Sequence, residues 1–252
     1  MHKGSGAKNP RPPALDPGAA LFLDVDGTLL EIAARPDLVQ VSDGLPRLIA
    51  HRAAERNGAL ALISGRPLSH LDALFRPWRG AAAGLHGIER RRADGSLAST
   101  VRQTEAIYRL RPKLATFAQS ACGLVFEDKG ASLALHYRAV PEREAEVLAV
   151  AERLHRSTDP DLRLIRGKLV AEFVPRDANK GRAIAAFLAE LPFLGRRPVF
   201  IGDDATDEDG FATVNQRGGI AVRVGPASET AAPYRLPSVA AVLAWLVDQG
   251  NL

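Results

Sequence analysis

The sequence has a single cysteine, Cys122, among its 252 residues. One cysteine excludes an internal disulfide framework, and without a second cysteine or a tight Cys/His cluster there is no tetrahedral zinc site to expect. A reducing compartment suits such a chain, so we predict a cytoplasmic protein. Because free cysteine is usually buried, we also expect Cys122 to fill a core position.

Long apolar runs are also missing. The first twenty residues, MHKGSGAKNPRPPALDPGAA, contain no stretch of signal-peptide or membrane length. Aromatic residues make up only 6% of the chain, and the positive charges behind the net charge of +4 are spread along it. This pattern does not favour a nucleic-acid-binding surface. We therefore expect neither membrane nor nucleic acid among the partners, and a flexible tail over residues 1–18.

The one basic cluster is the arginine run at residues 90–92. It precedes residues 93–95, Ala-Asp-Gly, which are typical of a turn. We interpret the cluster as the solvated edge of a hairpin rather than as a nucleic-acid patch.

Hydrophobic residues make up 46% of the chain, which is enough for a substantial core. Three short apolar runs, at 19–23, 59–63 and 198–201, each lead into a polar segment that contains glycine, and each is typical of a buried strand. Residues 43–56, between the first two runs, and 180–191, before the third, have apolar residues at helical spacing. This strand, helix, strand order predicts an α/β fold with a parallel sheet.

The middle of the chain has a different pattern. Residues 103–120 and 141–156 look helical, and residues 123–138 and 162–175 look like hairpins with turns at 128–130 and 166–167. A unit of about seventy residues can bury a small core of its own. We place this α+β unit, residues 103–175, as an insertion that separates residues 19–102 from residues 176–252 of the sheet domain.

The polar segments after the three strands are expected to converge, because ligands of open parallel sheets bind outside the carboxyl ends of the strands. In LFLDVDGTLL (21–30), Asp24 and Asp26 lie two residues apart and project to the same side of an extended chain. The segment GDDATDE (202–208) adds further carboxylates. Such a cluster needs a cation or shared protons, and its oxygen ligands favour Mg²⁺ over zinc.

Phosphate oxygens commonly complete the coordination of Mg²⁺, and the sequence offers groups that would bind a phosphate. Ser64 and the backbone of nearby glycines supply donors, and Lys180 lies where a predicted helix begins. Attack of a carboxylate on phosphorus is an established route of covalent catalysis. We expect Asp24 to attack and Asp26 to protonate the leaving oxygen and then activate water, while the metal and Lys180 stabilise the developing charge.

Each segment also has a plainer interpretation when taken alone. Asp-Gly is usually a turn, GDDATDE suits an acidic helix start, Ser64 suits an N-cap, and Lys180 suits the surface. A calcium loop is disfavoured, because its glycine belongs at the sixth position and its glutamate at the twelfth, whereas here glycine is fourth and Arg35 is twelfth. The order of the segments at successive strand ends favours the phosphate site.

The motifs DVDGTL, SGR, NKG and GDDATDE resemble, in this order, the four motifs of the haloacid dehalogenase-like phosphohydrolases, over almost all of residues 20–250. Within that superfamily, GLHGIE (84–89), EDKGASLALHYR (127–138), GKLVAEFVP (167–175) and GDDATDED resemble the trehalose-6-phosphate phosphatases. The resemblance implies a Rossmann-like core with helices on both faces of a parallel sheet, a mobile α/β cap, and Mg²⁺-dependent hydrolysis of trehalose 6-phosphate through an aspartyl-phosphate.

The resemblance also implies roles for individual residues. It makes Asp24 the nucleophile and Asp26 the general acid/base. The implied metal ligands are Asp24, Asp26 through its backbone carbonyl, and Asp203, supported by Asp204 and Asp207. The phosphate would be bound by Thr28, Ser64 and Lys180. The sugar would be bound by Arg66, His86 and Glu89 at the rim of the core and by Glu127, Lys129, Lys168 and Glu172 on the cap. His136 and Arg138 have no assigned role.

Two other functions stay open at this point. One is a phosphatase of the same superfamily that acts on another sugar phosphate or a phosphorylated osmolyte. The other is a non-catalytic module that senses trehalose 6-phosphate. A degenerate sensor is expected to lose an aspartate of the first or last motif, and this chain keeps both. We expect a monomer, and we leave open a functional coupling to a trehalose-6-phosphate synthase.

Overall fold

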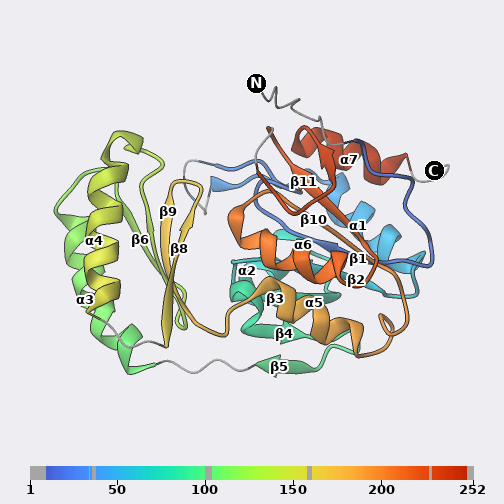
Figure 1. Cartoon of the computed structure of the whole chain (residues 1–252), viewed down its shortest axis with the longest axis horizontal. Helices are drawn as coiled ribbons and strands as arrows, with labels where there is room; N and C mark the ends of the chain where they lie inside the picture. Colours follow the sequence, from blue (N-terminus) through green and yellow to red (C-terminus); the bar gives the residue numbers. More distant parts are fainter. Residues whose placement is uncertain are drawn as a thin grey trace, which may run out of the picture.

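The computed structural model describes residues 10–33, 35, 38–99, 104–157, 161–226 and 229–248. The described chain forms two lobes, each built on its own sheet (Figure 1). The larger sheet has eight strands in the order β12-β11-β10-β1-β2-β3-β4-β5, and the smaller has four in the order β6-β7-β9-β8.

The larger sheet is mostly parallel, which confirms the predicted α/β class. Its parallel strands are β1 (Ala20–Leu23), β2 (Leu60–Ile63), β3 (Ala81–Gly84), β10 (Pro198–Gly202), β11 (Ile220–Val224) and β12 (Tyr234–Leu236). An antiparallel hairpin of β4 (Glu89–Arg91) and β5 (Leu97–Ser99) extends one edge. The apolar runs that predicted β1, β2 and β10 are buried throughout, because helices cover both faces of the sheet.

Helices pack on the two faces of this sheet as separate apolar layers. On one face lie α1 (Gly44–Ala54), α2 (Leu68–Leu74) and α7 (Val239–Val247), whose Ile49, Leu71 and Trp245 join one core cluster. On the other lie α5 (Lys180–Leu188) and α6 (Glu208–Asn215), which bury Phe187 and Phe211. Burial of each such side chain contributes about 1.5–3 kcal/mol to stability.

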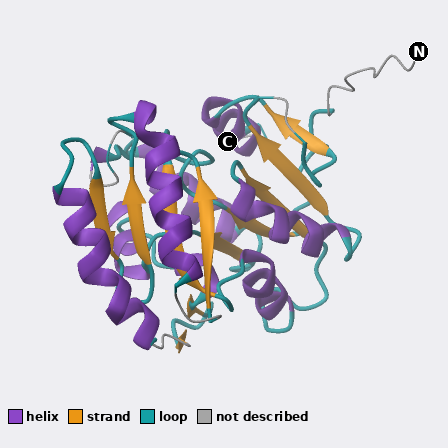
Figure 2. Cartoon of the chain, turned by 60° about the vertical axis from the view of Figure 1, so that its left-hand side comes forward, coloured by secondary structure: helices purple, strands orange, loops and turns teal. Residues whose placement is uncertain are grey.

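The smaller lobe combines four antiparallel strands with two helices (Figure 2). The strands are β6 (Val125–Asp128), β7 (Leu133–His136), β8 (Leu162–Gly167) and β9 (Val170–Pro175), and the helices are α3 (Glu105–Gln119) and α4 (Glu144–Arg156). Side chains alternate along β9, so Ala171 and Phe173 pack against the helices while Val170 and Glu172 line a cavity beside the larger lobe.

The chain passes from the larger to the smaller sheet after β5 and returns before α5. This topology supports the proposed division into residues 19–102, 103–175 and 176–252, which we keep as a proposal. The lobes meet at a small apolar cluster that includes Leu85 and Ile88 from the larger lobe and Ala131 and Val174 from the smaller. Single helical turns also occur at η2 (Leu85–Gly87), η3 (Pro141–Arg143) and η4 (Ala205–Asp207).

Two sequence-based predictions about the smaller lobe are wrong. Cys122 is exposed rather than buried, because it lies in the turn between α3 and β6. The turn of the second hairpin lies at Lys168 and Leu169 instead of 166–167, and Leu169 adopts a left-handed φ of 57° there.

The arginine run does form part of a hairpin, but it is not solvated throughout. Arg91 is buried and pairs with Asp72 at 2.8 Å. Arg90 and Arg92 both bind Glu190, at 2.7 and 3.2 Å. The cluster is therefore engaged within the protein.

Part of the predicted tail packs against the larger lobe. Leu15 is buried in the core, and the carbonyl of Pro10 accepts the N–H of Arg235 at 3.0 Å. Residues 1–9 lie outside the described residues. Among the helices that are described, none is both long and apolar enough to cross a membrane.

Candidate active site

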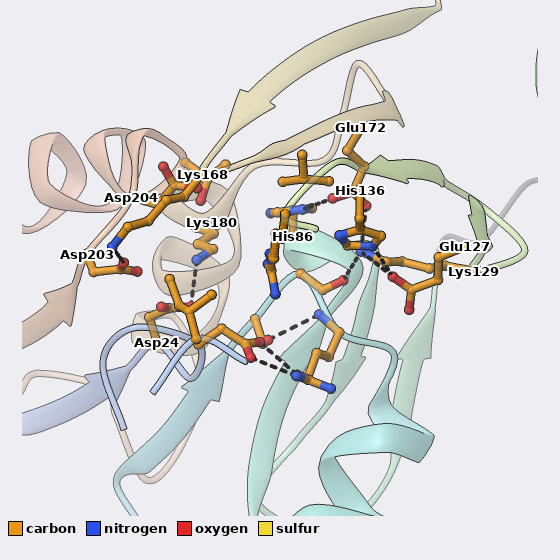
Figure 3. Close-up of a pocket in the computed structure, with 18 residues that line it drawn as sticks. Asp24, His86, Glu127, Lys129, His136, Lys168, Glu172, Lys180, Asp203 and Asp204 are labelled. Atoms are coloured by element: carbon orange, nitrogen blue, oxygen red, sulfur yellow. Dashed lines mark hydrogen bonds and ion pairs between the residues drawn. The ribbon is translucent and has the colours of Figure 1, made fainter. Parts of the chain in front are cut away.

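The polar segments after β1, β2 and β10 meet in one cavity of ≈ 100 Å³ between the two lobes (Figure 3). The sequence-predicted residues that line it are Asp24, Asp26, Ser64, Arg66, His86, Glu127, Lys129, Lys168, Glu172, Lys180, Asp203 and Asp204. Thr28, Glu89 and Asp207 are not among the residues that line it.

Lys180 links two carboxylates at the floor of the cavity. Its Nζ lies 2.7 Å from an oxygen of Asp24 and 2.7 Å from an oxygen of Asp207. All three side chains are buried. Although burial opposes it, the contacts with Asp207 and Asp24 raise the pKa of Lys180, so the ammonium stays charged. Lys180 is held at this point because it is the first residue of α5, directly after the N-cap Asn179.

Thr28 hydrogen-bonds to the side chain of Asp24. The Thr28 hydroxyl donates to the second carboxylate oxygen of Asp24 at 3.2 Å. Burial raises the pKa of Asp24 well above its ordinary value, Asp207 and Asp203 raise it further, and Lys180 opposes them. Thr28 therefore supports the predicted nucleophile, and the structure does not place it on the cavity surface.

Asp207 shapes the loop after β10. One oxygen accepts from Lys180, and the other accepts the backbone N–H groups of Asp203 and Asp204, both at 2.9 Å. A Cβ at Gly202 would lie 2.3 Å from the Asp207 carboxyl carbon, so only glycine fits beside it. Asp207 therefore positions Asp203 and Asp204 from beneath the cavity.

Three buried aspartates could hold a metal ion. One carboxylate oxygen from each of Asp24, Asp203 and Asp207 lies within 4.8 Å of the others. The oxygens of Asp207 already accept three hydrogen bonds, so Asp24 and Asp203 are the better direct ligands. Burial, followed by the charges of Asp207 and Asp204, raises the pKa of Asp203 to about 7. Carboxylates crowded in this way fit a hard divalent cation such as Mg²⁺.

The turn after Asp24 also approaches this cluster. Gly27 has a left-handed φ of 82°, and a Cβ there would lie 2.1 Å from a carboxylate oxygen of Asp203. The backbone beside Asp26 therefore comes directly against the Asp203 carboxylate. Glycine is needed at position 27 both for the turn and for this approach.

Asp26 is fixed by Arg66. The guanidinium donates to both carboxylate oxygens, through Nε and Nη2, each at 2.7 Å. Ser64 assists by accepting the backbone N–H of Arg66 at 3.1 Å. Although burial opposes it, the bond with Asp26 raises the pKa of Arg66. This pairing places the Arg66 guanidinium on the carboxylate of Asp26, the predicted general acid/base.

Lys129 and Glu172 line the cavity from the smaller lobe. Lys129 donates to Glu172 at 2.9 Å and, across the lobes, to the carbonyl of Gly65 at 3.1 Å. The other oxygen of Glu172 lies 3.2 Å from Nε2 of His86. Although burial opposes it, Lys129 and His86 hold the pKa of Glu172 well below its ordinary range. These contacts join the smaller lobe to the larger one.

His86 reaches Glu172 from an unusual backbone conformation. Its φ of 56° is left-handed, which costs about 1–2 kcal/mol for a residue other than glycine. A Cβ at Gly65 would lie 2.7 Å from the His86 ring, so the glycine of the SGR motif makes room for it. Lys168, the other predicted sugar-binding lysine of the smaller lobe, is exposed in the turn between β8 and β9, and its Nζ lies 3.9 Å from a carboxylate oxygen of Asp203.

Glu89 contacts the start of α2 and is not among the residues that line the cavity. Its carboxylate accepts the backbone N–H of Leu68 at 2.8 Å, at the start of α2. It satisfies one of the free N–H groups of a helix terminus.

His136 and Arg138, which had no role assigned from the sequence, also line the cavity. His136 lies 2.8 Å from Glu127, and Arg138 donates to the carbonyl of Ala33 at 2.9 Å. Because side chains alternate along a strand, the sequence could have predicted that His136 and Ala134 share one face of β7. It could not have predicted that His136 pairs with Val170, because this pairing depends on the register of β7 with β9.

Comparisons with known proteins identify the family of the chain. A family model described as trehalose-phosphatase matches residues 22–240. A probable trehalose-phosphate phosphatase of Sinorhizobium fredii (strain NBRC 101917 / NGR234) is 46% identical over 82% of this chain and 78% of its own length. The trehalose-6-phosphate phosphatase of Escherichia coli (strain K12) is 45% identical over 93% of this chain and 87% of its own.

Solved structures share the fold. The C-terminal domain of trehalose-6-phosphate phosphatase from C. albicans has a TM-score of 0.82 at 21% identity, covering 96% of this chain and 99% of that one. The sucrose-phosphatase of Synechocystis sp. PCC6803 has a TM-score of 0.57 at 17% identity, covering 92% and 98%. The matched family model and the relatives that share nearly half of its residues show that the chain belongs to the trehalose-phosphatase family.

Proposed function

We propose that this enzyme hydrolyses trehalose 6-phosphate to trehalose and phosphate through an aspartyl-phosphate on Asp24. The observation that carries the proposal is the buried Lys180 bridge, which presents the Asp24 carboxylate to the cavity beside Asp203. The substrate is taken from the names of the curated relatives in Sinorhizobium fredii and Escherichia coli. The cavity adds sugar-binding chemistry, because carboxylates, lysines and histidines of both lobes line it.

In the first step a carboxylate oxygen of Asp24 attacks phosphorus, and the bond between phosphorus and the sugar oxygen breaks. Asp26 gives its proton to the departing oxygen. Because Arg66 holds both oxygens of Asp26, the leaving oxygen must take the place of one of these hydrogen bonds. Lys180 stays charged beside Asp24 and stabilises the negative charge of the transferring group.

In the second step water attacks the phosphorus of the aspartyl-phosphate and gives a proton to Asp26. Phosphate leaves, and the Asp24 carboxylate is regenerated. Ser64, which is buried and lines the cavity, would donate to the phosphoryl oxygens. The cap contacts of Lys129 and Glu172 keep bulk water away from the intermediate while it exists.

Mg²⁺ is the proposed cofactor, held by Asp24, Asp203 and the backbone of Asp26. When bound, it supplies positive charge that offsets the crowded carboxylates and the phosphate. Asp207 and Asp204 support this set, Asp207 through its bonds to the loop that carries Asp203.

Binding of Mg²⁺ is expected to strengthen with pH. Asp203, with a pKa of about 7 in the folded protein, must lose its proton to bind the metal. Loss of the Asp203 carboxylate alone should lower the affinity by about tenfold for each pH unit below about 7. Without metal, the raised pKa stabilises the folded state at low pH, and this stabilisation is lost between about pH 4 and 7. The increase in melting temperature caused by Mg²⁺ should therefore be larger at pH 8 than at pH 6, and an equal increase at both would contradict the assignment.

The substrate claim is tested by phosphate release from a panel of sugar phosphates, with and without chelator. We expect the highest kcat/KM for trehalose 6-phosphate, ahead of sucrose 6-phosphate and glucose 6-phosphate, and loss of activity with chelator. Equal kcat/KM values across the panel would contradict the assigned substrate and favour a phosphatase for another sugar phosphate or a phosphorylated osmolyte. Binding of trehalose 6-phosphate without phosphate release would indicate a sensing module instead. A cytoplasmic location, a monomeric state and coupling to a synthase stay proposals that this panel does not address.

A further inference from the structure

Arg223 lies beside the acidic loop that follows β10 (residues 203–207), but it is not among the residues that line the cavity. β11 runs beside β10 in the sheet, and Arg223 pairs there with Gly202 at the end of β10 (Figure 1). Two residues earlier on β11, Ala221 is buried in the cluster that contains Phe211 of α6. Because side chains alternate along a strand, Arg223 extends on the face of the sheet that α6 covers.

The guanidinium of Arg223 contacts the acidic loop directly. Its Nη1 donates to the backbone carbonyl of Asp204 at 2.9 Å. The same nitrogen lies 3.5 Å from a carboxylate oxygen of Glu208, the first residue of α6. Glu208 is fixed in turn, because it accepts the hydroxyl of Thr230 at 2.7 Å and the backbone N–H of Ala231 at 2.8 Å. Only 15% of the Arg223 side chain is exposed, so burial and these contacts together restrict the guanidinium.

The peptide groups of the acidic loop are therefore held from two sides. The Asp207 carboxylate accepts the backbone N–H groups of Asp203 and Asp204, both at 2.9 Å. The carbonyl of Asp204 accepts the backbone N–H of Asp207 at 3.0 Å as well as the Arg223 guanidinium. Asp203, the predicted metal ligand, lies one residue before this carbonyl. The direction of its carboxylate therefore depends on both supports.

Arg223 acts on a divalent cation at this site in two ways of opposite sign. Its positive charge disfavours a nearby cation, whereas its hydrogen bond keeps the acidic loop, and with it the Asp203 carboxylate, in place. Glu208 offsets the charge at 3.5 Å, which leaves the electrostatic effect small. Contacts that orient a metal ligand from outside commonly change metal affinity by about 10–100-fold. We therefore expect the effect on position to be the larger of the two.

We propose that Arg223 is a positioning residue for the metal site, and that it fixes the acidic loop so that Asp203 faces Asp24 before Mg²⁺ binds. The proposal rests on the proposed function, since that function assigns Mg²⁺ to Asp24 and Asp203. A loop that is already in place loses less conformational freedom on binding, so the affinity is higher. Arg223 touches neither the substrate nor the reacting atoms in this role. A higher concentration of Mg²⁺ should therefore compensate for its loss.

The test is isothermal titration calorimetry of Mg²⁺ binding at pH 8, preceded by a melting curve for each protein. We expect Arg223→Met to raise the Kd for Mg²⁺ by about tenfold. Arg223→Gln, whose side chain is shorter, should show the same loss and decides the test if Arg223→Met does not fold. Arg223→Lys keeps the charge and one group of donors, so it should restore most of the affinity.

The matched control is Arg197→Met. Arg197 is exposed just before the opposite end of β10, where its Nε donates to the backbone carbonyl of Gly218 at 2.7 Å. This substitution also removes an arginine and a bond to a backbone carbonyl, but away from the acidic loop. The Kd for Mg²⁺ should therefore stay within about twofold of the wild-type value. In an assay of phosphate release, Arg223→Met should regain the wild-type kcat at saturating Mg²⁺.

Three results overturn the proposal. A Kd for Mg²⁺ that is unchanged or lower in Arg223→Met would mean that Arg223 acts through its charge or not at all. An equal rise in Arg197→Met would indicate a general effect on the fold. A kcat that stays low at saturating Mg²⁺ would place the defect outside metal binding. Failure of the proposed function has a different signature, because the wild-type protein would then bind no Mg²⁺ in the calorimeter, or would release phosphate at the full rate with chelator.

Discussion

Asp24→Asn is expected to lower kcat for trehalose 6-phosphate by on the order of 10⁵-fold, because an amide cannot form the acyl phosphate. The side chain keeps its size, and the Thr28 and Lys180 contacts surround it from two sides. Lys180 also keeps its second partner, Asp207 at 2.7 Å, so the substitution does not leave the ammonium buried without a counter-charge. The fold should therefore be retained.

The measurement is a steady-state assay with a melting curve for each protein. Asp177→Asn is the matched control, because Asp177 is an exposed carboxylate paired with Arg182. It should keep wild-type kcat. Substantial residual activity in Asp24→Asn, with an unchanged dependence on metal, would refute the covalent mechanism.

Lys180→Met is expected to cost both stability and activity. Methionine keeps much of the length of the side chain but leaves Asp24 and Asp207 buried without their shared cation. Breaking a buried pair in this way costs about 3–5 kcal/mol of unfolding free energy. Loss of the charge beside the transferring group should lower kcat by about 10²–10³-fold.

Urea unfolding with and without Mg²⁺ distinguishes this explanation from a simple packing defect. The divalent cation offsets the uncompensated carboxylates, so the loss of stability should be smaller in its presence. Lys113→Met, at an exposed position on α3, serves as the control and should change stability by less than about 0.5 kcal/mol. A Lys180→Met protein as stable as wild type without metal would contradict the assigned bridge.

The core of the site could be predicted because each motif directly follows a buried strand. The apolar runs of β1, β2 and β10 can be recognised in the sequence, and parallel pairing brings the carboxyl ends of these strands to the same edge of the sheet. By contrast, β3 consists of three alanines and a glycine and carries little strand propensity. Its Ala81 and Ala83 are buried in the cluster that also contains Ile184 and Phe187 of α5, so tertiary packing rather than strand propensity accounts for their burial.

The cap side of the site could not be predicted from spacing. Glu127 and Glu172 are far apart in the chain and reach one cavity through the register of β6, β7 and β9, which tertiary packing sets. Glu89 shows a second kind of contact that could not be predicted from the sequence. The resemblance implies that Glu89 binds the sugar, and the structure adds that its carboxylate accepts the backbone N–H of Leu68 at the start of α2, a contact that the motif does not predict.

Detection of a phosphoryl group on Asp24 tests the central claim most directly. In a single-turnover reaction with radiolabelled trehalose 6-phosphate and Mg²⁺, acid quenching followed by peptide mapping should find label on the peptide that contains Asp24. This label should be released by hydroxylamine, as expected of an acyl phosphate, and should decay as free phosphate forms. Complete turnover with label on another residue, or phosphate formation in Asp24→Asn at the wild-type rate, would contradict the account.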